Sequence, residues 1–471
     1  MSARPLPPPV ETFAATRALC NLCGRLTDAR IAFQGEEVWL EKHCLEHGPS
    51  RTLVSTDRAG YLLSLGFVKP GQDPRARAVR DYRGCPGSCG LCPAHQQHTC
   101  VPILELTGRC DLDCPVCLVH GQAQPELGLE DVRRVVAALL GYEGRLHMLN
   151  LSGGEPTAHP RFLEIVEELA ARPEIGVLSV STNGLRLGED ERLARRLAEL
   201  KVVVSLQVDG LAGEGDLALR GRPGLAALKR RALERVLAAG GRLSLVYTLE
   251  RGVNEAGLAE VLALLFSNDA ILSLMVQPLA HARRAPAGDL REVRAGLTTP
   301  EVVGLLVAAS GGVLEPRDLT PLPCSHPACF SLTYLLRARG GKLVSLPRLV
   351  DADTYLDAIK NQALLRTDPE GLQAVKDALY KLWSSSGVIP DREDVLATVK
   401  QLLLDLQRVD PRGPLRDGLE LGLTNVKSIF IHSFMDRYTF DLSRAMKCCN
   451  HYPQADGRML PACMRNVGLA R

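Results

Sequence analysis

Short apolar runs alternate with amphipathic helical patterns from residue 101 to about residue 320. The apolar runs are rich in β-branched residues and fall at 101–107, 147–153, 176–183, 202–210, 242–249 and 271–280. Helical periodicity separates them, as in 129–142, 161–172, 191–200, 225–239 and 256–267. Strands and helices that alternate with short connections form parallel βα units with right-handed crossovers. The pattern predicts an α/β domain with six parallel strands.

Changes in this pattern divide the chain into four segments. A length of 471 residues favours about three domains, and 46% apolar residues are enough to bury substantial cores. We expect a small metal-knuckle domain at 1–60, resembling a rubredoxin or zinc knuckle, and a cysteine-rich auxiliary iron–sulfur segment at 61–100. The α/β domain follows at 101–320. A mainly helical C-terminal domain at 321–471, helical above all from 351 to 424, carries further cysteines.

Charge and hydropathy exclude several classes of partner. The formal charge of +2 and the lack of any long lysine–arginine run give no sign of a basic surface that would bind nucleic acid. The N-terminus has no apolar signal region, and Gly, Ser or charged residues interrupt the longest apolar stretches well before a membrane span. We therefore expect a cytoplasmic enzyme with no transmembrane segment and no nucleic-acid partner.

Fifteen cysteines indicate metal chemistry. In a reducing compartment such a number favours metal binding or catalysis over a disulfide framework. A lone cysteine is usually a buried core residue, but these cysteines are grouped. The groups are Cys20, Cys23 and Cys44; Cys85, Cys89, Cys92 and Cys100; Cys110, Cys114 and Cys117; and Cys324, Cys329, Cys448, Cys449 and Cys463.

Cys110, Cys114 and Cys117 follow the first predicted strand with the spacing C-x3-C-x2-C. Three thiolates at this spacing hold three corners of an iron–sulfur cube and leave one iron open to a ligand with an amine and a carboxylate. S-adenosylmethionine offers both groups. The same spacing also occurs in half of a zinc site. The turn Leu151-Ser-Gly-Gly-Glu-Pro156, one βα unit later, favours the iron–sulfur interpretation.

The N-terminal cysteines form a candidate metal knuckle. Two strand-like runs joined by a turn bring Cys20 and Cys23 against Cys44 and His47, with His43 as the competing imidazole. Such a tetrahedral site suits zinc or a single iron.

The remaining cysteines are expected to form two auxiliary sites. Cys85, Cys89, Cys92 and Cys100 supply four thiols within one loop, which closes a 4Fe–4S cluster, although zinc also accepts four thiolates. Cys324 and Cys329 need two further ligands, and two of the three C-terminal cysteines would complete a long-range site. One of Cys448 and Cys449 is then left over, since adjacent residues rarely both reach one cluster.

Polar residues at one end of the predicted strands form a candidate cofactor site. Parallel α/β folds place their active sites at the carboxyl ends of the strands. Ordinary turn and cap chemistry also places polar residues there. The candidates are Gly153, Gly154, Glu155 and Pro156 after the second strand, Ser181 and Asn183 after the third, and Gln207, Asp209 and the later Arg220 after the fourth.

The motifs together resemble the radical S-adenosylmethionine (radical SAM) superfamily. The ordered motifs CxxC…HCxEHG, GCPxxCGLC, CxxxCPxC, LSGGEPTxHP, RGVN (251–254), PCSHPxCF, IHSFMD and CCxHY…DGRxxPxC look like its subfamily with tetraether lipid synthase and pterin methyltransferase-like proteins. The resemblance implies a partial (β/α)6 barrel and a Ser152–Pro156 segment that holds the methionine amino group. It also implies three 4Fe–4S clusters and one mononuclear iron or zinc. Many members carry an aromatic residue just before the third cysteine, whereas this chain has Val116.

The resemblance leaves two reactions open. One is hydrogen abstraction and carbon–carbon bond formation between lipid alkyl chains, as in tetraether lipid synthase, with peripheral access to a membrane. The other is radical methylation of a pterin or another small metabolite, which needs a polar or aromatic pocket for a flat ring. We expect the lipid reaction, with an external one-electron reductant of the flavodoxin or ferredoxin type.

Overall fold

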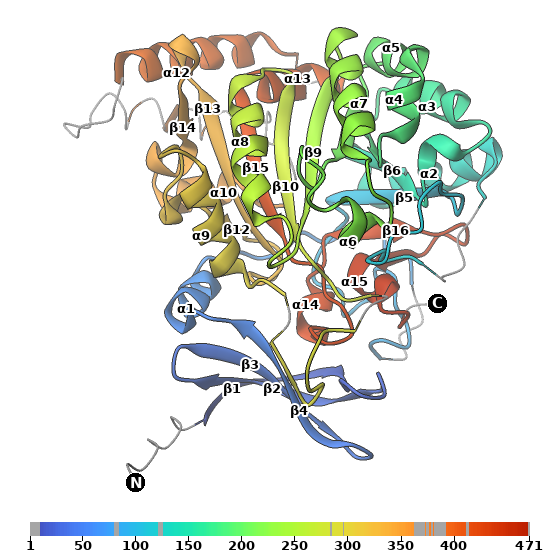
Figure 1. Ribbon diagram of the computed structural model, residues 1–471. Coiled ribbons are helices and arrows are strands. Elements are labelled where there is room, and N and C mark those ends of the chain that lie inside the picture. The colour runs from blue at the N-terminus through green and yellow to red at the C-terminus, as the bar shows by residue number, and fades with distance from the viewer. Residues whose placement is uncertain are drawn as a thin grey trace.

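A computed structural model describes residues 10–79, 84–120, 126–282, 285–294, 296–361, 392–410 and 414–469, with isolated residues between 373 and 380. The six expected parallel strands are confirmed and stand in chain order within one sheet (Figure 1). They are β5 (Val101–Thr107), β6 (Leu146–Gly153), β7 (Ile175–Thr182), β8 (Val203–Gln207), β9 (Arg242–Leu249) and β10 (Ile271–Pro278).

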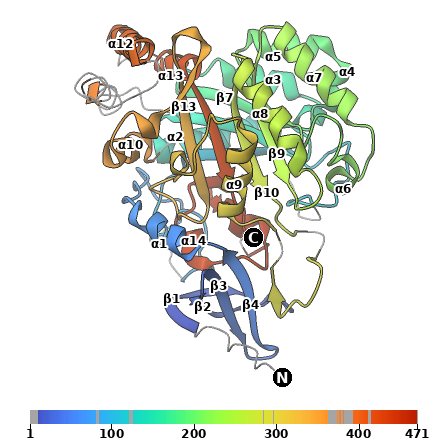
Figure 2. The same ribbon diagram turned by 60° about the vertical axis from the view of Figure 1, so that its left-hand side comes forward.

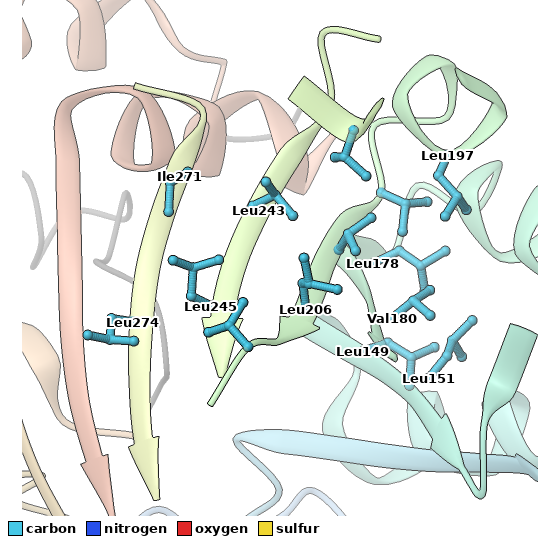
Figure 3. Close-up of a cluster of buried hydrophobic side chains, with 14 of the residues drawn as sticks. Leu149, Leu151, Leu178, Val180, Leu197, Leu206, Leu243, Leu245, Ile271 and Leu274 are labelled. Atoms are coloured by element: carbon cyan, nitrogen blue, oxygen red, sulfur yellow. The ribbon is translucent and has the colours of Figure 1, made fainter. Parts of the chain in front are cut away.

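Helices cover the outer face of this sheet. Buried leucines and valines alternate along each strand with residues that face the interior, because successive side chains of a strand point to opposite faces. Leu149, Leu178, Leu206, Leu243 and Leu245 lie side by side on the helix-facing side (Figure 3). The helices are α2 (Leu129–Glu143), α3 (Phe162–Ala170), α4 (Leu185–Glu189), α5 (Glu191–Glu199), α7 (Ala226–Ala238), α8 (Leu258–Ser267) and α9 (Thr299–Ala309). The short helix α6 (Asp216–Arg220) follows β8 at the carboxyl ends of the strands, where Leu219 packs with Val116 and Leu279.

The sheet continues beyond β10 with strands that the sequence analysis did not anticipate. Strand β15 (Val426–His432) runs parallel to β10, and β13 (Phe330–Arg337) pairs antiparallel with β15 (Figure 2). Short strands β12 (Thr320–Pro321) and β14 (Leu343–Ser345) pair with β13. The barrel is therefore partial and remains open, as expected for this fold class.

Helix α13 (Leu415–Asn425) lies across the amino ends of the strands. Its Leu419 packs with Val177, Val203 and Leu272 from the barrel interior. An ion pair between Arg242 and Glu420 fixes the helix to β9. The expected helical stretch 351–424 also contains α10 (Ala352–Ile359) and α12 (Arg392–Arg408), and most of its part between 362 and 391 lies outside the described residues.

The N-terminal segment forms a separate antiparallel sheet below the barrel (Figure 1). Strand β11, from the loop after β10, adds to its edge, and Arg294 of this loop forms an ion pair with Glu37 at 2.6 Å. The sheet and the barrel are thus joined through the loop that leaves β10. The elements are β1 (Val10–Leu19), β2 (Leu26–Gln34), β3 (Glu37–Cys44), β4 (Gly48–Ser55), β11 (Glu292–Val293) and helix α1 (Arg58–Gly66).

The C-terminal segment returns to the other edge of the barrel. Strand β16 (Asn450–Pro453) runs parallel to β5, where Asn450 pairs with Val101, and β17 (Met459–Pro461) completes a hairpin. Short helices α14 (Leu442–Met446) and α15 (Ala462–Asn466) flank this hairpin. Among the helices described, none is long and apolar enough to cross a membrane.

Replacing Leu245 by Ala should destabilise the barrel, because Leu245 is fully buried between β9 and the helices. Truncation of a buried leucine costs about 2–5 kcal/mol. Chemical denaturation followed by circular dichroism measures the loss. Leu217, whose residue surface is 64% exposed, provides the matched control, and its Ala variant should unfold close to wild type. Equal midpoints for Leu245→Ala and wild type would contradict the assigned packing.

Candidate active site and metal centres

A cavity of about 640 Å³ occupies the interior of the barrel. The loop that follows β5 lines it at the carboxyl ends of the strands, and Leu419 and Leu423 of α13 line the opposite end. Strands β13 and β15 line one side, while Asn450 and Tyr452 of β16 lie on another. Segments between Cys100 and Tyr452 that are far apart in the sequence therefore enclose one cavity.

Cys110, Cys114 and Cys117 all line this cavity. Their loop is fixed from below by the segment that follows β6, because Gly154 N donates to Thr107 O at 2.8 Å and Glu155 N donates to Arg109 O at 2.6 Å. A Cβ at Gly154 would lie 2.4 Å from Arg109 O. Glycine is required here so that the two backbones can approach each other.

Glu155 is a structural anchor at the carboxyl end of β6. Its carboxylate accepts hydrogen bonds from Thr157, Thr182 and the backbone N–H of Asn183, and its residue surface is 2% exposed. Burial raises the pKa of this carboxyl group above its usual value, while the hydrogen bonds oppose that shift. The contacts tie the end of β6 to the end of β7.

The expected cofactor residues occupy several environments. Gly153 packs on β5, where a Cβ would lie 2.4 Å from Thr107 O, and Pro156 is buried in the turn after β6. Gly154, Glu155, Ser181, Asn183, Gln207 and Arg220 line the cavity. Asn183 also donates to Asp111 of the cysteine loop at 2.5 Å. Asp209 lies behind Arg220, with its carboxylate bound by the Arg220 guanidinium at 2.7 and 2.9 Å. Contacts of these residues with S-adenosylmethionine remain predictions.

A row of small polar side chains crosses the middle of the cavity, and we call it the serine row. Five serines stand in register on five neighbouring strands, and an asparagine continues the row on β6. Sequence analysis singled out only one of them, although each interrupts an otherwise apolar strand, which is the signal that would have found them. The row comprises Asn150, Ser181, Ser205, Ser244, Ser273 and Ser428, all of which line the cavity.

Aromatic side chains from β13 and β15 form one wall of the cavity. The His432 ring stacks on Phe330 with centroids 4.0 Å apart, and Phe434 lies 3.8 Å away on a tilted plane. Burial lowers the pKa of His432 to about 3, so the ring is neutral near pH 7. The wall offers flat, uncharged surfaces four residues along β15 from Ser428, toward the carboxyl ends of the parallel strands.

The expected metal knuckle is assembled in the N-terminal sheet. The ligand atoms of Cys20, Cys23, Cys44 and His47 lie within 4.8 Å of one another. Four soft ligands at this spacing fit a single tetrahedral ion. Elsewhere in the described residues, no group of three metal-ligating side chains is equally compact, so the other thiol groups suit a wider cluster.

Cys100 belongs to a different group from the expected one. Its thiol is in hydrogen-bonding contact with both Cys324 and Cys449, and these contacts raise the pKa of Cys100 well above its usual value. The expected grouping with Cys85, Cys89 and Cys92 is wrong because β16 pairs with β5 and brings Cys449 beside Cys100, whose N–H donates to Cys449 O at 2.9 Å.

The other auxiliary thiols also form groups of three. Burial first, and then the charges of the neighbouring thiols, raise the pKa of Cys85 to about 11 and that of Cys89 to about 12. Burial first, and then the charges of Cys463, Cys449 and Cys329, raise the pKa of Cys448 well above its usual value. Neither Cys448 nor Cys449 is left over. Buried thiols this close together fit iron–sulfur clusters. Their raised pKa values keep them protonated when no metal is present, and binding to iron displaces the protons.

The cysteine loop and the glycine turn lie within one recognised domain. Residues 104–265 match the family model described as the radical SAM superfamily. The chain carries a radical SAM domain. This domain implies S-adenosylmethionine and a 4Fe–4S cluster, for which Cys110, Cys114 and Cys117 are the available ligands. Residues 12–56 match a model described as the HMPTM N-terminal zinc ribbon domain, which covers the metal knuckle.

Curated relatives extend the similarity beyond the radical SAM domain. A 7,8-dihydro-6-hydroxymethylpterin dimethyltransferase of Methanocaldococcus jannaschii is 25% identical over 96% of this chain and 93% of its own length. A GTP 3′,8-cyclase of Parasynechococcus marenigrum is 34% identical, but over only 32% of this chain and 49% of its own. Among solved structures, the FeFe-hydrogenase maturase HydG from Carboxydothermus hydrogenoformans matches with a TM-score of 0.38 and 15% identity, over 69% of this chain and 82% of that chain.

Replacing His47 by Ala should remove the knuckle metal, because His47 supplies the fourth ligand atom. Replacing the exposed His43 by Ala is the matched control and should leave the metal in place. Elemental analysis of the purified proteins measures the difference, with cluster iron unchanged in both. Metal loss in His43→Ala but not in His47→Ala would show that the wrong imidazole has been assigned.

Cys100→Ala, Cys324→Ala and Cys449→Ala should each lose the same iron–sulfur signal, since ligands of one cluster act as a unit. Iron analysis and electron paramagnetic resonance (EPR) of anaerobically reconstituted protein provide the measurement. The double variant Cys100→Ala/Cys324→Ala should lose no more iron than either single variant. The double variant Cys85→Ala/Cys100→Ala should lose as much iron as the two single variants together. A smaller loss would show that Cys85 and Cys100 bind the same cluster, as the sequence suggested.

Proposed function

We propose that this radical SAM enzyme methylates carbon on a pterin or a similar small, uncharged, nitrogen-rich ring. The serine row is the main support for the proposal, because it lines the same cavity as the cysteine loop. The similarity over nearly the whole chain to a 7,8-dihydro-6-hydroxymethylpterin dimethyltransferase supports the same class of substrate. Both observations favour the methyltransferase alternative over the lipid reaction expected from the sequence.

The polarity of the cavity distinguishes the two substrate classes. Ser244 and Ser273 bond each other at 2.6 Å, and Asn150 bonds Ser181 at 3.0 Å. The row still offers further donors and acceptors, because each hydroxyl has one donor and two acceptor sites. An alkyl chain would cover these groups without satisfying them, which costs about 1–3 kcal/mol for each buried group. A ring edge with N–H, N and C=O groups would satisfy them.

The charge of the cavity favours an uncharged ring. The ion pair of Arg220 with Asp209 lies near the cysteine loop and not in the middle of the cavity, and His432 is neutral near pH 7. The Glu155 carboxylate already accepts hydrogen bonds from Thr182 and Asn183. Phe330 and Phe434 add flat surfaces on which a planar ring can stack.

When bound, the cluster and S-adenosylmethionine supply one-electron cleavage of the sulfonium and hydrogen abstraction from an unactivated C–H bond. The chain itself positions the reacting carbon and excludes water. The serine row would orient the polar edge of the ring, and α13 closes the far end of the cavity. A flavodoxin or ferredoxin would deliver the electron.

Anaerobic incubation with a reductant, 7,8-dihydro-6-hydroxymethylpterin and excess S-adenosylmethionine, which would serve both as the radical source and as the methyl donor, should yield a methylated pterin, detected by mass spectrometry. Ser205→Ala removes one partner from the row and should raise the KM for the pterin by about 3- to 10-fold, the value of one hydrogen bond. Ser267→Ala, at an exposed position of α8, is the matched control.

A second arm of the experiment separates the substrate classes. Archaeal-type glycerol ether lipids replace the pterin, and lipid coupling is sought in the same reaction. Coupled lipid with no methylated pterin would overturn the proposal. An unchanged KM in Ser205→Ala would show that the serine row does not bind the ring.

A further inference from the structure

Arg220 is a buried cation that reaches the cysteine loop from the end of α6. Its residue surface is 6% exposed, and its guanidinium binds Asp209 in two places and Thr248 at 2.9 Å. It also forms a side-chain hydrogen bond with Cys114. One guanidinium therefore joins the ends of β8 and β9 to a candidate cluster ligand.

The residue after Arg220 shows how tightly this segment packs on the cysteine loop. Gly221 has a φ of +71°, and a Cβ there would lie 3.2 Å from Asp113 O and 3.3 Å from Pro115 Cδ. Only glycine combines this backbone conformation with so close an approach at little cost. The backbone next to Arg220 is therefore held against the cysteine loop.

Asp209 fixes the direction of the guanidinium. Its residue surface is 1% exposed, and its carboxylate also accepts the N–H of Thr248 at 2.9 Å. The backbone around it is held by Asn254, whose Nδ2 donates to Asp209 O at 3.0 Å and to Thr248 O at 2.8 Å. Asn254 closes the RGVN motif, which the proposed function leaves without a role. The motif thus supports the orientation of Arg220.

The network carries a net positive charge toward the cysteine loop. Lys229, with a residue surface 1% exposed, lies 3.4 Å from the same Asp209 carboxylate. Two cations therefore share one anion. Positive charge and hydrogen bonds to the sulfurs favour the reduced, more negative state of an iron–sulfur cluster and so raise its potential.

We propose that Arg220, oriented by Asp209, donates a hydrogen bond to the Cys114 sulfur and thereby raises the reduction potential of the cluster on Cys110, Cys114 and Cys117. Arg220 is a positioning and tuning residue in this role. The inference does not depend on the substrate, because the potential belongs to the cluster before any substrate binds.

The test is an EPR-monitored redox titration of the anaerobically reconstituted full-length protein without substrate. The relevant cluster is the one whose signal changes when S-adenosylmethionine is added. Arg220→Gln should shift its potential to a more negative value. Arg220→Lys should shift the potential less than Arg220→Gln does. Lysine keeps the positive charge but loses the two-pronged contact with Asp209. Arg222→Gln, two residues away and exposed, is the matched control and should titrate as wild type.

Lys229→Gln provides a second test that keeps the contact between Arg220 and Cys114. It removes one of the two cations on Asp209, so the potential should move in the same direction as in Arg220→Gln, but less. If Arg220→Gln holds its cluster, equal potentials in Arg220→Gln, Arg222→Gln and wild type would overturn the proposal. If Arg220→Gln does not hold its cluster, Lys229→Gln replaces it in the test, and a wild-type potential in Lys229→Gln would overturn the proposal.

Discussion

The parallel pairing of β5 to β10, extended by β15, is the constraint on which the site depends. Register in a sheet decides which face each side chain occupies, and a slip of one residue would exchange the two faces. With the observed register, Leu149, Leu206 and Leu245 face the helices, while Ser205, Ser244 and Ser273 face the cavity. The same register brings the carboxyl ends of the strands together below the cysteine loop.

The pairing of β16 with β5 organises the thiols. It joins two segments that lie more than three hundred residues apart and brings Cys449 beside Cys100. Cys448 and Cys449 lie just before β16, where Cys449 contacts Cys100 and Cys448 lies near Cys463 and Cys329, so the two adjacent thiols can serve different groups. The fifteen cysteines then divide into five sets of three, one of which His47 completes.

Electrostatics divides the interior into two regions. Near the cysteine loop, Arg220 and Lys229 compensate Asp209 and leave one positive charge in a dry environment, where charges interact strongly. In the middle of the cavity, the serine row and the neutral His432 provide hydrogen bonding without charge. This division suits a charged cofactor at one end of the cavity and an uncharged ring in its middle.

The sequence by itself determined the local features. Short apolar runs identified the six strands, because strands that are packed on both faces consist largely of apolar residues. Short spacings identified the cysteine loop and the two ligand pairs of the knuckle, because the ligands within each of these groups are close in sequence. Tertiary structure alone decided which distant groups meet. The Cys100 site, β15, the serine row and the Arg220 contact all depend on pairings between remote segments, and no spacing within one segment encodes such a pairing. For the same reason, the sequence suggested that Cys85, Cys89, Cys92 and Cys100 share one site. The pairing of β16 with β5 instead places Cys100 beside Cys449.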